Sequence, residues 1–544
     1  MRNFTKLLSF MLLVGFLFNS CRNPAYEINV LFDADVIKYK ATVLLKDAAG
    51  NVLPNTFKAT VTGTNAASIY DFSGTKAIPV VNNVITLGVT PKEVPTAGQS
   101  VTFDLNITGP GYEDKVIPVE IAFNQFSQII EVFLLKTVVP TPATSVVVKE
   151  IPLSPTGATT TLTTFATPTQ GDVQETTSIS VPAGVQFKDA AGNTLVGGSV
   201  TAQAINFNAD DPSIAALFPG GQLSAPNVKD ENGNVGSAFF LPAGFTDIQM
   251  FVGGVEVKNF TTPITVGIQL NPDFMPSSGI PLVAGDQMPV YYYQTETGQF
   301  TYHSMGTAAT DANGKLTVNF QTNHLTIFIV GEVIKTPSCI DPIATFTAPW
   351  LLNGARKIVR VETVRTSDGD LLASKLIEIG DGSTAPLQGL PPFPVTVIVK
   401  DEPNGKILGS FAVVNPCAGS AVTIPVTAPD GPPLDFITLL LNVNCPGKGT
   451  IVVPNFDLFY KPVGAPNTAF VLLGTAVKGS FKTTNLKIGS SYDFRAIWGS
   501  QTKTVGNRPI TAADMSETVG ENDFLGSKSP NYNKMLLIEA CKGQ

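Results

Sequence analysis

The chain has 544 residues, a length that predicts three to five domains rather than one. Charged residues make up only 14% of it, so Thr, Ser, Asn and Gly must cover much of the surface. The formal net charge is -8 and the sequence has no basic stripe, which excludes nucleic acid as the expected partner. The 48 glycines and 41 prolines separate short apolar runs, a pattern typical of β-sandwiches with many turns.

Residues 1–20 have the pattern of an export signal. Arg2 and Lys6 supply a positively charged start, and a mainly apolar run follows from residue 7 to residue 18. This run is shorter than the about 20 apolar residues that a membrane-spanning helix needs. The pattern therefore predicts a signal peptide rather than a transmembrane segment.

Cys21 directly follows the small residue Ser20 at the end of this signal. The arrangement resembles the lipobox of Bacteroidetes-type bacterial lipoproteins, although Phe18 and Asn19 differ from the usual residues. The resemblance implies a diacylglycerol and N-acyl lipid on Cys21, with residues 21–26 as the lipidated tether. Two or more acyl chains are enough for stable anchoring. The alternative is an ordinary secretory signal with a chance cysteine.

The residue after the cysteine bears on the choice of membrane. Arg22 stands there instead of the Asp associated with retention in the inner membrane, which favours the outer membrane. The stretch up to Glu27 lacks the acidic cluster that tends to accompany export to the cell surface. We therefore expect an outer-membrane lipoprotein. The sequence does not decide between the periplasmic and the cell-surface face of that membrane.

Residues 27–137 alternate apolar and polar side chains in short runs, as at 37–43 and 101–107. A period of two buries one face of a strand and leaves the other in water. Turn sequences separate the runs, so we expect an immunoglobulin-like or transthyretin-like sandwich. The Pro- and Thr-rich residues 138–145 predict a stiff, extended linker.

The hexapeptide Lys-Asp-Ala-Ala-Gly-Asn occurs twice, at residues 46–51 and at residues 188–193. Asp and Gly both suit the tight backbone of a hairpin turn, so we interpret the repeat as turn chemistry. The same repeat is compatible with two sandwiches of similar design.

Residues 146–335 carry a series of short motifs in a fixed order. The order resembles the ZU5-related β-module shared by cartilage intermediate layer proteins and FAM171-type proteins. Phe300 stands where that module usually has Trp, and Thr326 stands where it often has Ser. The resemblance implies a structural or interaction module and supplies no catalytic residues. The motifs are Val181–Gly184, its recurrence Leu241–Gly244, Phe260–Val266, Tyr291–Phe300 and His324–Phe328.

Residues 336–428 and 429–544 alternate again and predict two further sandwiches. The fold class is therefore all-β, with tandem immunoglobulin-like or carboxypeptidase-regulatory-like sandwiches behind a lipoprotein signal peptide. Setting Cys21 aside leaves four cysteines. An even number of cysteines in an exported protein suggests disulfides, and four cysteines allow three connectivities. We favour Cys339 with Cys417 and Cys445 with Cys541, because each pair then brackets one module. The four cysteines lack Cys-x-x-Cys spacing and a nearby histidine, so we do not expect zinc.

The candidates for metal binding are few. His303 and His324 both fall in strand-like runs, and a metal pair is conceivable, but no third ligand stands at a diagnostic spacing. Asp368 and Asp370 are the best calcium candidates among the acidic turns, yet none of these turns fits an EF-hand loop. We expect structural roles for the histidines, a hairpin turn at the two aspartates, and no metal.

Aromatic side chains are the candidates for a glycan ligand. In a strand Tyr291 and Tyr293 share one face and Tyr292 takes the other, so we expect at least one tyrosine to meet solvent. Trp350 and Trp498 are two further candidates. Packing in a core is the stronger alternative for both tryptophans.

The sequence contains no Gly-x-Ser-x-Gly, Walker or dinucleotide motif, so we expect no enzyme, no catalytic residue and no cofactor beyond the lipid on Cys21. It predicts a non-enzymatic, lipid-anchored cell-envelope protein. Such a protein would act as a binding or scaffold subunit, held to the membrane by its lipid and bound to a protein partner in the outer membrane. The alternatives are a glycan-binding or glycan-processing surface lipoprotein, and an adhesin.

Overall fold

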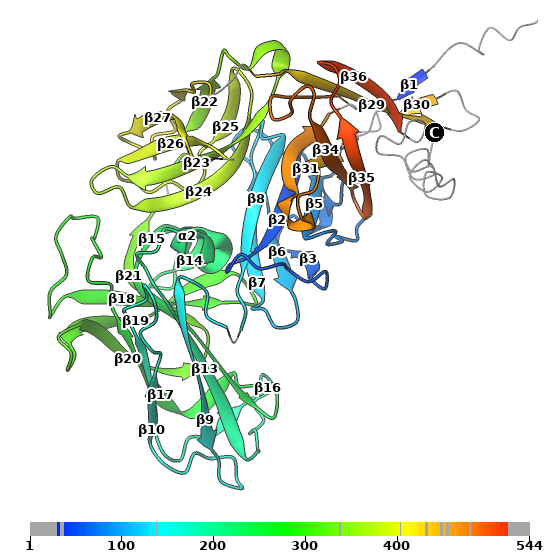
Figure 1. Ribbon diagram of the computed structural model, residues 1–544. Coiled ribbons are helices and arrows are strands. Elements are labelled where there is room, and N and C mark those ends of the chain that lie inside the picture. Colours follow the sequence, from blue (N-terminus) through cyan, green and yellow to red (C-terminus); the bar gives the residue numbers. More distant parts are fainter. Residues whose placement is uncertain are drawn as a thin grey trace, which may run out of the picture. The chain divides into compact units, whose positions relative to one another are not determined.

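The computed structural model describes residues 30–32, 37–137, 139–336, 339–402, 404–429, 434–445, 450–452, 456–477 and 480–519 (Figure 1). The signal peptide, Cys21 and Cys541 lie outside these residues. The chain divides into two compact units, residues 37–432 and residues 1–36 with 433–544. No helix in the described part is long and apolar enough to cross a membrane. Both units consist of β-sheets that form tandem sandwiches, which confirms the predicted all-β fold.

The first sandwich, residues 37–137, packs a four-stranded sheet (β4-β5-β2-β8) against a three-stranded one (β3-β6-β7). Its elements are β2 (Lys40–Asp47), β3 (Lys58–Thr62), η1 (Ala66–Ser68), β4 (Ile69–Tyr70), β5 (Val84–Val89), β6 (Val101–Thr108), β7 (Lys115–Ile121) and β8 (Ser127–Leu134). Every second side chain of β6 is buried, so the predicted alternation places one face of this strand in the core. β7 and β8 are the edge strands that face the rest of the unit.

The second sandwich, residues 139–336, is built from thirteen strands. The strand β19 is long: most of it pairs with β18 and its last three residues pair with β20, so it passes from one layer to the other. The elements are β9 (Thr144–Pro152), β10 (Thr163–Ala166), β11 (Thr177–Val181), β12 (Phe187–Lys188), β13 (Ser199–Phe207), α2 (Ile214–Leu217), η2 (Pro219–Gly221), β14 (Ser224–Lys229), β15 (Val235–Val252), β16 (Val255–Glu256), β17 (Asn259–Gln269), β18 (Gln287–Gln294), β19 (Gln299–Thr310), β20 (Leu316–His324) and β21 (Ile327–Lys335).

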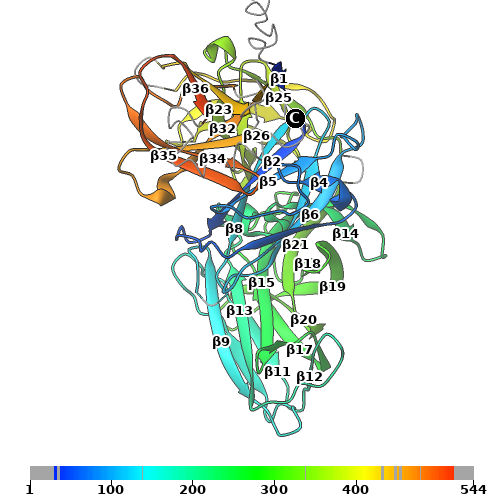
Figure 2. The ribbon, with the colours of Figure 1, turned by 90° about the vertical axis from the view of Figure 1, so that its right-hand side faces the viewer.

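The strands β9, β13 and β15 run side by side through this sandwich in both views (Figure 1; Figure 2). β15 has a bulge between Pro242 and Gly244, at the second copy of the Pro-Ala-Gly motif. A Cβ atom on Gly244 would lie 2.9 Å from the carbonyl oxygen of Gln269. The glycine therefore lets β15 approach β17 more closely than a residue with a side chain could.

The third sandwich, residues 339–429, has two sheets in the orders β25-β22-β28 and β24-β23-β26-β27. The Cys339–Cys417 disulfide joins the segment before its first strand to the segment before its last, as the sequence predicted. The elements are β22 (Ile343–Thr347), η3 (Leu352–Gly354), β23 (Lys357–Arg365), β24 (Leu371–Ile379), β25 (Ser383–Pro386), β26 (Val395–Asp401), β27 (Ile407–Val413) and β28 (Val422–Pro425).

The second unit holds the C-terminal sandwich, with a core around Leu458 and Phe494. Its elements are β29 (Ile437–Cys445), β30 (Thr450–Val452), β31 (Phe456–Pro462), η4 (Asn467–Ala469), β32 (Val471–Ala476), β33 (Ser480–Thr483), β34 (Ser491–Trp498), β35 (Gln501–Pro509) and β36 (Asp514–Val519). The short strand β1 (Val30–Phe32) pairs in parallel with β30. The segment that precedes the first sandwich therefore contributes a strand to this last unit. The proposed Cys445–Cys541 disulfide lies outside the described residues, because Cys541 does.

Candidate binding site

The three sandwiches of residues 37–432 meet around a hollow of about 520 Å³. Its walls come from the edge strands β7 and β8, from the segment 212–227 of the second sandwich, and from β24 with residues 388–390 of the third. Helix α2 lies between β8 and β24 (Figure 1). Pockets of about 300–1,000 Å³ commonly hold small molecules, so this hollow is the candidate site.

Glycines allow the backbones to come together at this junction. Gly389 has a positive φ of 75°, and a Cβ atom placed on it would lie 2.2 Å from the Ser224 side-chain oxygen. Gly220 and Gly221 in η2 also have positive φ angles of 82° and 73°, and they lie against Pro118 and Ile117 of β7. Larger residues would be strained by the positive φ at all three positions, and at Gly389 a side chain would also collide with Ser224 of the second sandwich.

An ion-pair network fixes the first sandwich to the third. The Arg360 guanidinium donates hydrogen bonds to Glu131 of β8 (2.8 and 3.3 Å) and to Glu402 (both 2.8 Å). Lys46 also contacts the Glu131 carboxylate. Burial raises the pKa of the Glu131 carboxyl, but its hydrogen bonds and the charges of Arg360 and Lys46 outweigh burial and lower the pKa overall. Paired, oriented contacts of this kind are the stronger class of ion pair.

Two further contacts fix the first sandwich to the second. The Lys115 ammonium donates to the carbonyl oxygens of Phe133 (3.1 Å) and Ala216 (3.0 Å), and burial lowers its pKa to about 8. The Tyr293 hydroxyl donates to the carbonyl oxygen of Val116 (3.1 Å). Each contact satisfies a buried polar group across the junction, so separating the sandwiches would leave these groups without their partners.

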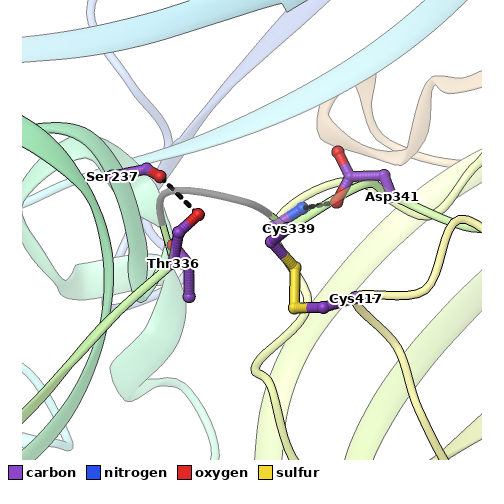
Figure 3. The surroundings of a disulfide bond; sticks show 6 residues. Ser237, Thr336, Cys339, Asp341 and Cys417 are labelled. Carbon is purple, nitrogen blue, oxygen red and sulfur yellow. Dashed lines mark hydrogen bonds between the residues drawn. A yellow bond between two sulfur atoms is a disulfide. The ribbon is translucent and has the colours of Figure 1, made fainter.

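Two charged side chains of the third sandwich line the hollow. Asp341 accepts a hydrogen bond from the Gly389 amide (3.1 Å), and Lys375 donates one to the carbonyl oxygen of Gln388 (3.0 Å). Burial, with the charge of Glu120 adding to it, raises the pKa of Asp341 to about 6, and burial lowers the pKa of Lys375. The disulfide half-cystine Cys339 lies two positions before Asp341 and holds this segment in place (Figure 3).

The first and third sandwiches each contribute one lining residue with an unpaired amide atom. The side-chain oxygen of Gln128 and the side-chain nitrogen of Gln388 are buried and have no partner among the described residues. On the second-sandwich side of Figure 3, the Ser237 hydroxyl donates to the carbonyl oxygen of Thr336 (2.8 Å) and is therefore already engaged. The polar groups of the lining thus divide into those that hold the junction together and buried amide atoms without a partner among the described residues.

The predicted glycan aromatics lie elsewhere. Tyr291 and Tyr293 are each 3% exposed and belong to the core of the second sandwich, where Tyr291 packs edge-on against Phe240. Neither ring is available to a ligand at the surface, which corrects their assignment as ligand aromatics. The alternation places these two on one face as expected, but that face is the inner one. Tyr292, on the other face, is half-buried against His303 and His324.

The two tryptophans are placed in or beside cores. Trp350 is half-buried and donates its indole N–H to the carbonyl oxygen of Val426 (2.9 Å). Trp498 is half-buried and packs against the core of the C-terminal sandwich. Neither side chain belongs to the lining of the hollow.

The two histidines lie in one aromatic cluster. The ring centroids of His303 and His324 are 5.9 Å apart, and both rings pack against Phe328. Burial and the neighbouring His303 charge lower the pKa of His324 to about 4, so its ring is neutral at physiological pH. The described residues hold no group of three or more His, Cys, Asp or Glu side chains suited to a metal ion.

The acidic turn proposed for calcium is occupied by an arginine. Arg365 lies 3.5 Å from the Asp368 carboxylate and 3.3 Å from that of Asp370. In the acidic turn at residue 230, the aspartate side chain bonds to the backbone of its own turn. Asp230 accepts hydrogen bonds from the amides of Asn232 and Asn234 (both 2.9 Å). Such side-chain bonds are typical of Asx turns, which agrees with the hairpin interpretation.

Sequence reasoning named none of the lining residues as a binding residue, and it named Cys339 only for its disulfide. Asp341, Lys375, Gln128 and Gln388 belong to no motif. Gln128 of the first sandwich lines the same hollow as the other three residues, which belong to the third sandwich, only because these sandwiches pack together. The one local signal is the Pro-Gly-Gly run at 219–221, since glycine readily adopts the positive φ found at Gly220 and Gly221.

Comparison with known proteins gives distant matches only. No family model matches the chain, so the resemblance of residues 146–335 to the cartilage intermediate layer protein module rests on its short motifs alone. No curated protein matches it either.

Among solved structures, the chain is similar to the TIE protein of Bacillus anthracis (11% identity, 69% of this chain and 57% of that one, TM-score 0.13). It is also similar to the minor pilin GBS52 of Streptococcus agalactiae (11%, 32% and 94%, TM-score 0.13). A third match is the major pilin SpaD of Corynebacterium diphtheriae (9%, 89% and 96%, TM-score 0.13). The chain thus spans little more than half of the TIE protein, and at these TM-scores the matches carry no argument about function.

Proposed function

We propose that this chain is a non-enzymatic, lipid-anchored cell-envelope protein that acts as a binding or scaffold subunit at the outer membrane. The observation that carries the proposal is the junction of residues 37–432. Three sandwiches are joined there by side-chain contacts of Arg360, Lys115 and Tyr293, in addition to the chain segments that connect them. A body fixed in this way presents its outer surfaces in one constant geometry, which is what a scaffold subunit requires.

The anchor supplies the second part of the proposal. Cys21 carries the lipid, and residues 22–29 separate it from β1, which pairs within the C-terminal unit. This stretch reaches at most about 28 Å when fully extended. The C-terminal unit is therefore the part of the chain that the tether reaches first.

Replacing the lipidated residue tests the anchor. The variant Cys21→Ser should leave the membrane fraction and lose fatty-acid labelling, since it removes the acceptor sulfur of the lipid. Membrane fractionation with radiolabelled palmitate is the measurement, and Cys339→Ser provides a matched loss of one cysteine that should stay membrane-bound. A Cys21→Ser protein that remains labelled and membrane-bound contradicts the anchor.

The partner is tested by purification from outer membranes in mild detergent. A scaffold or binding subunit should copurify with an outer-membrane protein in fixed stoichiometry, whereas a monodisperse monomer without a partner contradicts the proposal. Protease treatment of whole cells distinguishes the two faces of the membrane, because only a surface-exposed chain is cleaved in intact cells.

A further inference from the structure

We propose that the hollow between the three sandwiches is a binding site for a neutral, polyhydroxylated small molecule of monosaccharide size. This site is independent of the scaffold role, which concerns the outer surfaces of the same body. Four features of the hollow support the proposal: a separated pair of opposite charges, unused amide groups, a negative wall and an apolar wall.

The pair consists of Asp341 and Lys375. Each charge stabilises the ionised form of the other, yet the two side chains do not form an ion pair with one another. Asp341 bonds to the Gly389 amide and Lys375 to the Gln388 carbonyl oxygen, so the carboxylate keeps acceptor capacity and the ammonium keeps N–H donors. A hydroxyl group fits between them, because it can donate to a carboxylate and accept from an ammonium at the same time.

The unused amide groups extend this pattern. The Gln128 oxygen is a buried acceptor and the Gln388 nitrogen a buried donor, and neither has a partner among the described residues. Both residues belong to the lining, but both atoms are buried where they lie, so each amide must turn toward the hollow before a ligand reaches it. Unsatisfied buried groups are unfavourable, so a ligand that supplies both donors and acceptors favours this turn. A molecule with several hydroxyl groups supplies both from each of its oxygens.

The charges around the hollow select against ionic ligands. Asp104 and Glu120 add negative charge to the lining, while Glu131 is already neutralised by Arg360 and Lys46. An anion would therefore be repelled by the lining, and a cation placed beside Asp341 would be repelled by Lys375. A neutral ligand avoids both penalties.

The remaining wall is apolar. Pro118 of β7 and Leu390 of the third sandwich contribute carbon-rich surface to the lining. The ring of a sugar has C–H groups on its faces and hydroxyl groups at its edge. Such a ring can pack on this wall while its edge meets Asp341 and Lys375, and the volume of about 520 Å³ accommodates it.

The test measures binding of matched sugars to the detergent-solubilised full chain by calorimetric titration and by thermal shift. D-glucose, D-galactose, D-mannose and N-acetylglucosamine are the neutral probes, with glucuronate as the anionic and glucosamine as the cationic analogue. We expect at least one neutral sugar to bind with a Kd about tenfold or more below those of both charged analogues. Failure of all neutral probes to bind, or equal binding of glucuronate, overturns the proposal.

Variants then locate the bound sugar. The double variant Asp341→Asn with Lys375→Met removes both charges together and avoids leaving one of them buried alone. It should weaken binding of the neutral sugar by about tenfold or more, while its melting temperature without ligand shows whether it is folded. Gln388→Leu should weaken binding as well, whereas Gln170→Leu at an exposed turn should leave it unchanged. If the double variant and Gln388→Leu both fold and bind like the wild type, the sugar sits elsewhere and the proposal is wrong.

Discussion

The same hexapeptide occupies two places in this molecule, at residues 46–51 and at residues 188–193. Both copies form the same turn. The amides of Asn51 and Asn193 donate to the side chains of Asp47 (3.2 Å) and Asp189 (2.8 Å), and the glycines of the two copies have φ angles of 74° and 81°. Local sequence therefore determines the conformation of the turn in both sandwiches.

The surroundings of the two aspartates differ. Asp47 is 5% exposed, and its second oxygen accepts a hydrogen bond from the buried Tyr112 hydroxyl (2.8 Å), with Lys136 at 4.0 Å. Asp189 bonds instead within its own turn, to the backbone and side-chain amides of Asn193. Identical sequences thus give identical turns, while the contribution of each turn to stability depends on what packs over it.

The largest expected effect comes from Asp47→Ala. The change removes the acceptor of the Tyr112 hydroxyl as well as the turn contacts, so it should lower the free energy of unfolding by about 2–3 kcal/mol. Urea unfolding followed by circular dichroism measures it. Asp189→Ala is the matched variant and should have a clearly smaller effect, because it removes turn contacts only. Equal losses of unfolding free energy in the two variants would contradict the difference between the two turns.

Tyr112→Phe should have the next largest effect, about 1–2 kcal/mol, because the Asp47 carboxylate keeps its turn contacts but loses the hydroxyl. The double variant with Asp47→Ala isolates the coupling between the two side chains. We expect the losses to be less than additive. Strict additivity would mean that the 2.8 Å hydrogen bond contributes nothing.

The pH dependence should be the smallest effect. Burial raises the pKa of the Asp47 carboxyl, but the hydrogen bonds from Tyr112, Asn51 and Ala49 outweigh it, and the pKa is lowered below its ordinary value of 3.8. A lowered folded-state pKa gives stability that is present above the unfolded value and is lost as the pH falls through the folded value.

The advantage of the wild type over Asp47→Asn should therefore be constant from pH 7 to about 5 and shrink below about pH 4. Urea unfolding of both proteins at pH 7, 5 and 3 provides the comparison. An advantage at pH 3 as large as that at pH 7 contradicts the assignment of a lowered pKa to Asp47.

The hexapeptide also illustrates how far sequence reasoning reaches. Turn chemistry, alternating strands and the Cys339–Cys417 pair all depend on local pattern or simple bracketing, and each is present in the structure. The Tyr291–Tyr293 run shows the limit. A period of two assigns residues to faces, but it does not say which face is buried when the neighbouring sheet is unknown.

The hollow could not have been predicted for a related reason. Asp341 lies in a loop and Lys375 in an ordinary strand, and Gln128 comes from another sandwich more than two hundred residues away along the chain. Their meeting depends on close approaches such as that of Gly389 to Ser224. Contacts between separately folded modules leave no periodic trace in the sequence.

The central claim is that residues 37–432 behave as one interlocked body, and hydrogen exchange followed by mass spectrometry tests it most directly. Peptides from the cores of the first, second and third sandwiches should share one opening free energy, and Arg360→Met should lower that value for all three sandwiches together. Three different opening free energies, with Arg360→Met affecting only its own sandwich, would contradict the claim.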